Sequence, residues 1–95
     1  ERVHLAEDGL ITIVVSLDEL SVSVKTVKIV TKGLVLEETF VKELKANLTN
    51  ALNQVDLRAV KNEEELSNII RKSIKNFVFR AIKKNPMILP IILVV

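Results

Sequence analysis

Apolar residues recur with two different periods along the chain, and the change of period divides it into strands and helices. Residues 10–17 are rich in β-branched side chains and alternate between two faces, which predicts a strand. Residues 22–36 read as a second strand, but their valines change from even to odd positions near Lys25 and Thr26. We expect a bulge at this point, because one extra residue changes which side chains face the core.

Two later segments show the three- and four-residue spacing of amphipathic helices. The first helix is expected to begin near Thr39 and to end before a loop over residues 53–58. The second has Asn62 as its N-cap and Glu65 three residues later, a pairing typical of a capping box. It is expected to end at Asn85, since the proline that follows cannot continue a helix. The apolar stripe of the second helix comprises Leu66, Ile69, Ile70, Ile74, Phe77, Val78 and Ala81.

The last eleven residues carry no charged side chain, and the nine from Met87 onward are apolar or proline. This run is too short for the ~20 residues of a membrane-spanning helix, but it suits a strand buried on both faces. One face of the strand presents Met87, Leu89, Ile91 and Leu93, and the other presents Ile88, Pro90, Ile92 and Val94. The alternation does not decide which of these faces meets the helices.

The order of the segments, β-β-α-α-β, predicts an α+β fold. We expect a two-layer sandwich in which a three-stranded sheet carries both helices on one face. Residues 10–95 are assigned to this single domain, and residues 1–9 to the end of a linker that leads into it.

Two helices with one apolar stripe each can cover only one face of such a sheet. The other face of the last strand then needs a partner, and a two-fold dimer is the simplest way to supply one. Pro90 cannot donate to a β-ladder, so we expect the partner to pack on the sheet face rather than to extend the sheet. The candidate interface residues are Ile88, Pro90, Ile92, Val94, Val14 and Phe79.

The charges are distributed unevenly, although the totals of 14 Lys and Arg and 12 Asp and Glu nearly balance. Glu65 is the last acidic residue, so the charged side chains after it are all basic. A basic segment can attract RNA phosphates, although a solvated helix face accounts for the same pattern. The candidate phosphate contacts are Arg71, Lys72, Lys75, Lys83 and Lys84.

The sequence offers little for catalysis. Cysteine is absent, and His4 is the single histidine, so neither a nucleophile paired with a base nor a zinc ligand set is expected. The acidic clusters at residues 37–38 and 63–65 fall at predicted helix starts, where the helix dipole favours them. Two glycines cannot form a phosphate-binding loop, and the lack of Trp and Tyr argues against base stacking. We therefore expect a domain without catalytic residues, metal or cofactor.

The run Asn-Pro-Met-Ile-Leu-Pro-Ile-Ile at residues 85–92 resembles the C-terminal signature of bacterial ribonuclease J. Three further segments resemble that family at matching spacing: Leu-Ala-Glu-Asp-Gly at residues 5–9, Ile-Val-Thr-Lys-Gly-Leu-Val at 29–35, and Phe-Val-Phe at 77–79. The Ile-Arg pair at residues 70–71 also fits. The resemblance extends over nearly the whole chain.

The resemblance implies the C-terminal domain of a larger enzyme that joins a metallo-β-lactamase domain to a β-CASP domain. Such enzymes are hydrolases that degrade RNA by 5′→3′ exonucleolytic and endonucleolytic cleavage during RNA processing and mRNA decay. The family's zinc ligands, a His-x-His-x-Asp-His motif, are absent here, so zinc is expected in the catalytic part of the parent. The implied partners are a second copy or a paralogous ribonuclease J subunit, and RNA through the parent. A cytoplasmic location without membrane contact is expected.

The chain departs from the family's pattern at seven positions. Thr26-Val27 replaces a Gly-Pro pair, and Leu34 and Leu36 replace aromatic residues. Lys84-Asn85 replaces paired arginines, and Val94 replaces an acidic residue, which makes the last strand more apolar. These changes resemble the second, less active paralogue found in some Gram-positive bacteria, and they weaken any transfer of RNA contacts to this chain.

Overall fold

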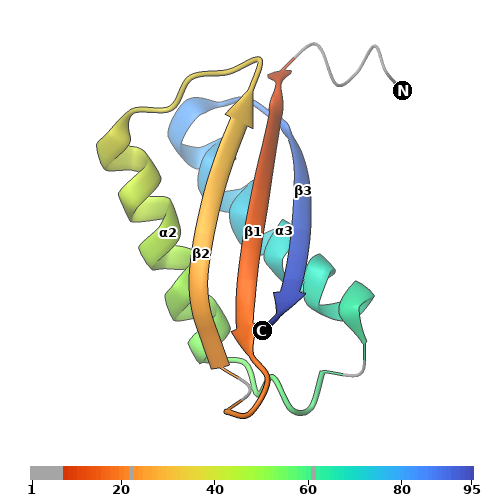
Figure 1. Ribbon diagram of the computed structural model, residues 1–95. Helices are drawn as coiled ribbons and strands as arrows, with labels where there is room; N and C mark the ends of the chain where they lie inside the picture. The colour runs from red at the N-terminus through yellow and green to blue at the C-terminus, as the bar shows by residue number, and fades with distance from the viewer. Residues whose placement is uncertain (1–7, 22, 61) are drawn as a thin grey trace.

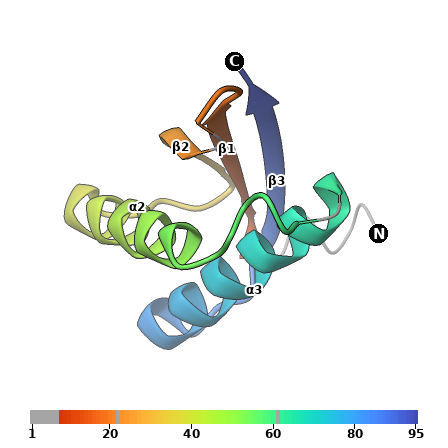
Figure 2. The ribbon, with the colours of Figure 1, turned by 90° about the horizontal axis from the view of Figure 1, so that it is seen from below.

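The computed structural model describes residues 8–21, 23–60 and 62–95. The elements are β1 (Leu10–Asp18), β2 (Ser23–Lys32), α2 (Glu38–Asn53), α3 (Glu63–Ile82) and β3 (Met87–Val94). The strands form one sheet in the order β2-β1-β3, and both helices cover the same face of it (Figures 1 and 2). The predicted two-layer α+β fold is therefore confirmed. Most of the expected linker segment, residues 1–7, lies outside the described residues.

Strand β1 is the centre of the sheet. It pairs antiparallel with β2 and parallel with β3, so every ladder hydrogen bond of the sheet involves it. Ser16 pairs with Thr26, but the next residue, Leu17, pairs with Val24, so the register with β2 shifts between them. Lys25 is the extra residue, and the expected bulge is confirmed. The segment after Gly33 does not continue β2, as the second predicted strand did, but bends toward α2.

The helices start where their sequence signals place them. Asn62 is the N-cap of α3, and its side-chain oxygen accepts a hydrogen bond of 2.8 Å from the backbone N–H of Glu65. The predicted end of α3 at Asn85 is wrong. The helix ends at Ile82, and Lys83 adopts a left-handed conformation (φ 57°) that ends the helix before Pro86 is reached.

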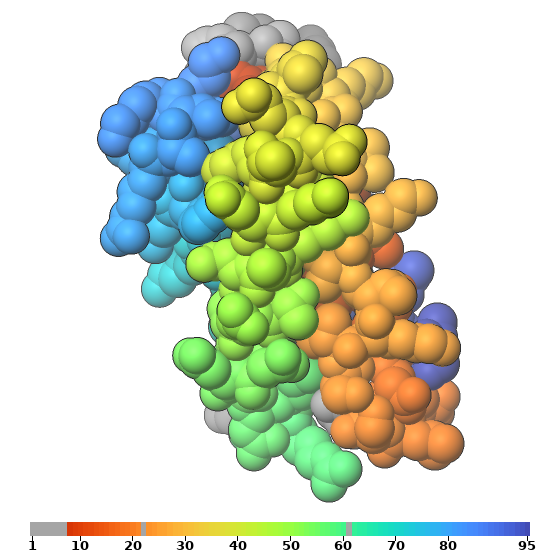
Figure 3. Space-filling model, turned by 90° about the vertical axis from the view of Figure 1, so that its left-hand side faces the viewer, coloured from red at the N-terminus to blue at the C-terminus, as the bar shows by residue number. Residues whose placement is uncertain are grey.

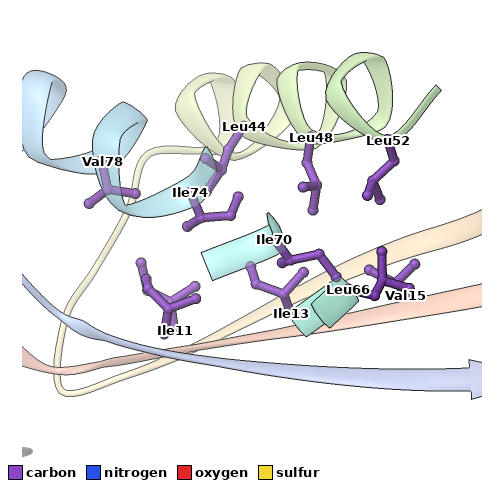
Figure 4. Packing of buried hydrophobic residues seen from close by; sticks show 11 residues of the cluster. Ile11, Ile13, Val15, Leu44, Leu48, Leu52, Leu66, Ile70, Ile74 and Val78 are labelled. Atoms are coloured by element: carbon purple, nitrogen blue, oxygen red, sulfur yellow. The ribbon is translucent and has the colours of Figure 1, made fainter. Parts of the chain in front are cut away.

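The core lies between the sheet and the two helices. In Figure 4 the leucines of α2 and the apolar stripe of α3 point toward alternate residues of β1. Phe40 of α2 and Phe77 of α3 stack with ring centroids 5.5 Å apart and add to the contact between the helices. The buried residues are Ile11, Ile13, Val15, Leu44, Leu48, Leu52, Leu66, Ile70, Ile74, Val78 and Ile88.

The start of β1 is tied to the start of β3 through Asp8 and Gly9. The Asp8 carboxylate accepts a hydrogen bond of 3.0 Å from the backbone N–H of Asn85, and the Gly9 carbonyl accepts one of 3.0 Å from Met87. Gly9 has a positive φ of 90°, and a Cβ there would lie 2.8 Å from the Cβ of Leu34. The position therefore needs glycine for its backbone conformation and for space.

We predict that Gly9→Ala lowers the free energy of unfolding by about 2–4 kcal/mol, because it adds a steric clash to backbone strain. Gly33→Ala is the matched control. Gly33 also has a positive φ (74°), but its Cβ would meet only the Gly9 Cα at 3.4 Å. Strain alone should cost about 1–2 kcal/mol there. Urea denaturation of both variants measures the difference, and equal losses would contradict the assigned clash.

Candidate interface on the free sheet face

The sheet face opposite the helices is called the free face here. Cross-strand partners share a face and alternate residues change face, so the registers determine which residues belong to it. It comprises Thr26, Lys28, Val30 and Lys32 of β2, Leu10, Thr12, Val14 and Ser16 of β1, and Met87, Leu89, Ile91 and Leu93 of β3. In Figure 1 this face is turned toward the viewer, in front of the helices.

The β3 part of the free face is an unbroken apolar stripe. Its members expose large fractions of their surface: Met87 45%, Leu89 45%, Ile91 37% and Leu93 46%. In the side view of Figure 3 the side chains of β3 protrude beyond the flank formed by β2. The β2 part has another character, since its exposed Lys28 and Lys32 alternate with Val30. A contiguous apolar stripe of this kind is a candidate interaction surface.

The predicted interface residues divide between the two faces of the sheet. Val14 lies on the free face, beside Ile91. Ile88 does not, because it is 5% exposed within the core, and the assignment of this residue to a partner interface is wrong. Ile92 packs half-buried against the same core. Pro90 and Val94 share its side of β3, so they do not belong to the free face.

Phe79, the last of the predicted interface residues, lies on α3 and not on the free face. It is 44% exposed, and the Lys83 ammonium lies 5.9 Å from its ring centroid. This geometry is that of a cation–π contact at the end of the helix. Since α3 covers the other face of the sheet, Phe79 cannot join the apolar stripe in one flat interface (Figure 2).

The outer edge of β3 is poorly suited to pairing with another strand. The Met87 and Val95 N–H groups bond to carbonyls of Gly9 and Leu17, so backbone groups of odd-numbered residues point inward and those of even-numbered residues point outward. Pro90 therefore lacks its N–H where an incoming strand would need it. At the same edge, the Arg71 Nε donates to the Ile88 carbonyl at 3.5 Å. The predicted edge position of Pro90 is confirmed.

The structure gathers three of the five predicted phosphate contacts. Arg71, Lys72 and Lys75 line one hollow of about 460 Å³ on α3, together with Glu65, Asn68 and Ile69. A second hollow of about 230 Å³ lies between α3 and the start of β3 and shares Arg71 and Lys75. The guanidinium of Arg71 also donates to the Asn68 side-chain oxygen at 2.9 Å. Lys83 and Lys84 lie apart from these hollows, beyond the end of the helix.

Asp18 is the last residue of β1, and its pKa is shifted from the ordinary value of an aspartate. Its carboxylate accepts hydrogen bonds from the backbone N–H groups of Ser21, at 3.1 Å, and Leu20, at 2.8 Å. These bonds stabilise the charged form and lower the pKa of Asp18, and Lys25 adds to the effect. Asp18 therefore carries a negative charge at neutral pH.

Within residues 8–21, 23–60 and 62–95, no three His, Asp or Glu side chains lie close enough together to hold a metal ion. His4 falls outside these ranges. None of the helices in the described part of the chain is long and apolar enough to cross a membrane. Among the described residues, the free face combines the apolar stripe of β3 with exposed lysines of β2.

Comparison with known protein families finds a match over the whole chain. The family described as Ribonuclease J C-terminal domain matches residues 1–95. The chain belongs to the ribonuclease J C-terminal domain family. A search among curated proteins found no match. As a member of this family, the chain is an accessory domain of a ribonuclease J rather than its catalytic part.

In this ribonuclease J domain, the run that suggested the family occupies one structural region. Residues 85–92 contain the connection from α3 and most of β3, including Pro86, which is buried, and Pro90 at the sheet edge. The run therefore supplies both the core residue Ile88 and part of the exposed apolar stripe. The sequence signal that identified the family coincides with the candidate interface.

The direction of the Pro90 nitrogen gives a test of the edge assignment. We predict that Pro90→Val changes the free energy of unfolding by less than about 1 kcal/mol, because the restored N–H points away from β1. Ile91→Pro is the matched contrast. It removes an N–H that points toward β1 and should cost about 3 kcal/mol or more. Urea denaturation compares them, and similar losses for both variants would contradict the assignment.

Proposed function

We propose that the free sheet face is the surface through which this ribonuclease J domain associates with a second ribonuclease J subunit. The domain would then act as an assembly module that positions the catalytic bodies of the subunits. Those bodies are expected to carry the metallo-β-lactamase and β-CASP domains, the zinc ions and the RNA-cleaving activity of the parent. The described chain supplies the contact between subunits and no catalytic group.

The apolar stripe of β3 is the observation that carries this proposal. Met87, Leu89 and Leu93 each expose close to half of their surface although they lie in a regular strand. Burial of apolar surface contributes about 25 cal/mol per Å², so leaving this stripe in water forgoes a large stabilisation. The helices cannot supply the burial, because both already pack on the opposite face.

The edge of β3 supports face packing over strand addition. Pro90 removes an outward donor from the middle of the edge, and Arg71 lies against the outward carbonyl of Ile88. The opposite edge of the sheet, β2, carries three exposed lysines, which discourage edge pairing between like-charged strands. A partner that packs flat on the free face needs none of these backbone groups.

We predict that Leu89→Lys raises the dissociation constant of the self-associated chain by at least about tenfold, equivalent to about 1.4 kcal/mol. The charge would lie in the middle of a buried apolar contact without a counterion. Sedimentation analysis across a concentration series measures the change.

Val35→Lys is the matched control for this prediction. Val35 is 95% exposed in the segment between β2 and α2, and it is not part of the free face. Its replacement adds the same charge and should leave association unchanged. A parent chain that stays monomeric at high micromolar concentration would refute self-association, and equal effects of both variants would refute the assigned face.

A second candidate function is binding of the RNA backbone, favoured by the gathering of Arg71, Lys72 and Lys75 on one hollow. The acidic side chain that lines that hollow, Glu65, belongs to the first turn of α3. Such cations give sequence-independent attraction to phosphates. This surface lies on the helix layer, so it can act together with association through the free face.

We predict that single-stranded RNA binds the chain with a salt dependence that K72E/K75E reduces. The log–log slope should fall by about 0.7 for each RNA phosphate that the variant no longer neutralises. The control is K42E/K45E, which changes the net charge equally but alters α2. Fluorescence titration at two salt concentrations measures both. The RNA function is refuted if the parent does not bind at low salt, or if both variants weaken binding equally.

A further inference from the structure

Two copies of the free face can pack with aligned strands in two ways. A two-fold axis that lies in the interface along the strands makes the strands of both copies run in the same direction and reverses their lateral order. Then β2 of one copy lies over β3 of the other. An axis across the strands makes them run in opposite directions and keeps the lateral order, so each strand lies over its own counterpart. The residues of the free face distinguish these arrangements.

With strands in the same direction and β1 centred on β1, the apolar stripe is covered by β2. The registers then place Lys32 over Met87 and Lys28 over Ile91 of the other copy. Each stripe would face two ammonium-bearing side chains in place of apolar ones. Because β2 and β3 are both edge strands, the ammonium groups can still reach solvent, but each stripe buries less apolar surface than it would against a second stripe.

With strands in opposite directions, the two β3 stripes cover each other. Met87 then lies over Leu93, and Leu89 lies over Ile91 of the other copy. The lysines of β2 then face β2 of the other copy. Lys32 lies over Thr26, and the ammonium of Lys28 can reach solvent past the sheet edge. This arrangement buries apolar surface against apolar surface along the whole stripe.

The charges at the two ends of the sheet do not distinguish the arrangements. Asp8 and Lys32 lie at one end of the sheet, and Lys25 and Asp18 lie at the other. Each end therefore carries both signs of charge, and the orientation follows from the position of the apolar stripes.

We infer that two copies of this domain pack through their free faces with their strands antiparallel across the interface, β3 on β3. This inference rests on the proposed association through the free face and adds its partner, a second copy of the chain, and its orientation. The antiparallel packing places the first residues of β1 in the two copies at opposite ends of the paired domains, because Leu10 pairs with Lys32 at one end of each sheet.

Cross-linking of single-cysteine variants tests the orientation, because the chain has no cysteine of its own. Lys32→Cys is mixed with Thr26→Cys in one reaction and with Met87→Cys in another; all three positions are exposed. A thiol-reactive cross-linker of about 10 Å matches the spacing of packed sheets. One variant of each pair carries an isotope label, so that mass spectrometry distinguishes mixed from identical pairs.

We expect the mixed product of Lys32→Cys with Thr26→Cys to exceed that with Met87→Cys several-fold. Sedimentation of each variant first establishes that it associates as the parent does. A dominant product with Met87→Cys, or equal yields from an associated sample, overturns the antiparallel orientation and leaves the proposed function standing. A parent chain that remains monomeric refutes the proposed function, and the orientation fails with it.

Discussion

The fold depends on a constraint that β1 imposes: a central strand has two edges to pair and two faces to cover. Strands β2 and β3 use both edges, and the helices cover the face that holds Ile11, Ile13 and Val15. In a chain of this length no further layer of described residues covers the other face (Figure 2). The apolar residues that β3 contributes to that face are thus left to water or to a partner.

For this reason the two faces of β3 lie in different environments. Ile88 and Ile92 complete the core beneath the helices, while the residues that alternate with them form the exposed stripe. The edge of the same strand is restricted by Pro90 and by Arg71. One short strand thereby stabilises the domain, offers an apolar face and limits the ways in which a second chain can approach.

The chain belongs to the ribonuclease J C-terminal domain family, an accessory part of the enzyme. The described residues bring together no metal-ligating cluster, and their polar side chains serve turns and helix ends, as Asp18 and Asn62 do. Among the described residues, the most unusual feature is the exposed apolar stripe of β3. Under the proposed function, this surface would hold two subunits together.

The sequence by itself determined the elements, their order and several local details. The bulge at Lys25 followed from a change of valine phase, and the start of α3 followed from the spacing of Asn62 and Glu65, because both signals are local. The end of α3 was misjudged, since a left-handed Lys83 gives no signal in the residue types. Both sides of β3 are apolar, so alternation could not separate core from surface. Only the parallel register with β1 decided that Ile88 is buried and Leu89 exposed, because the face of a strand is set by its neighbour's register.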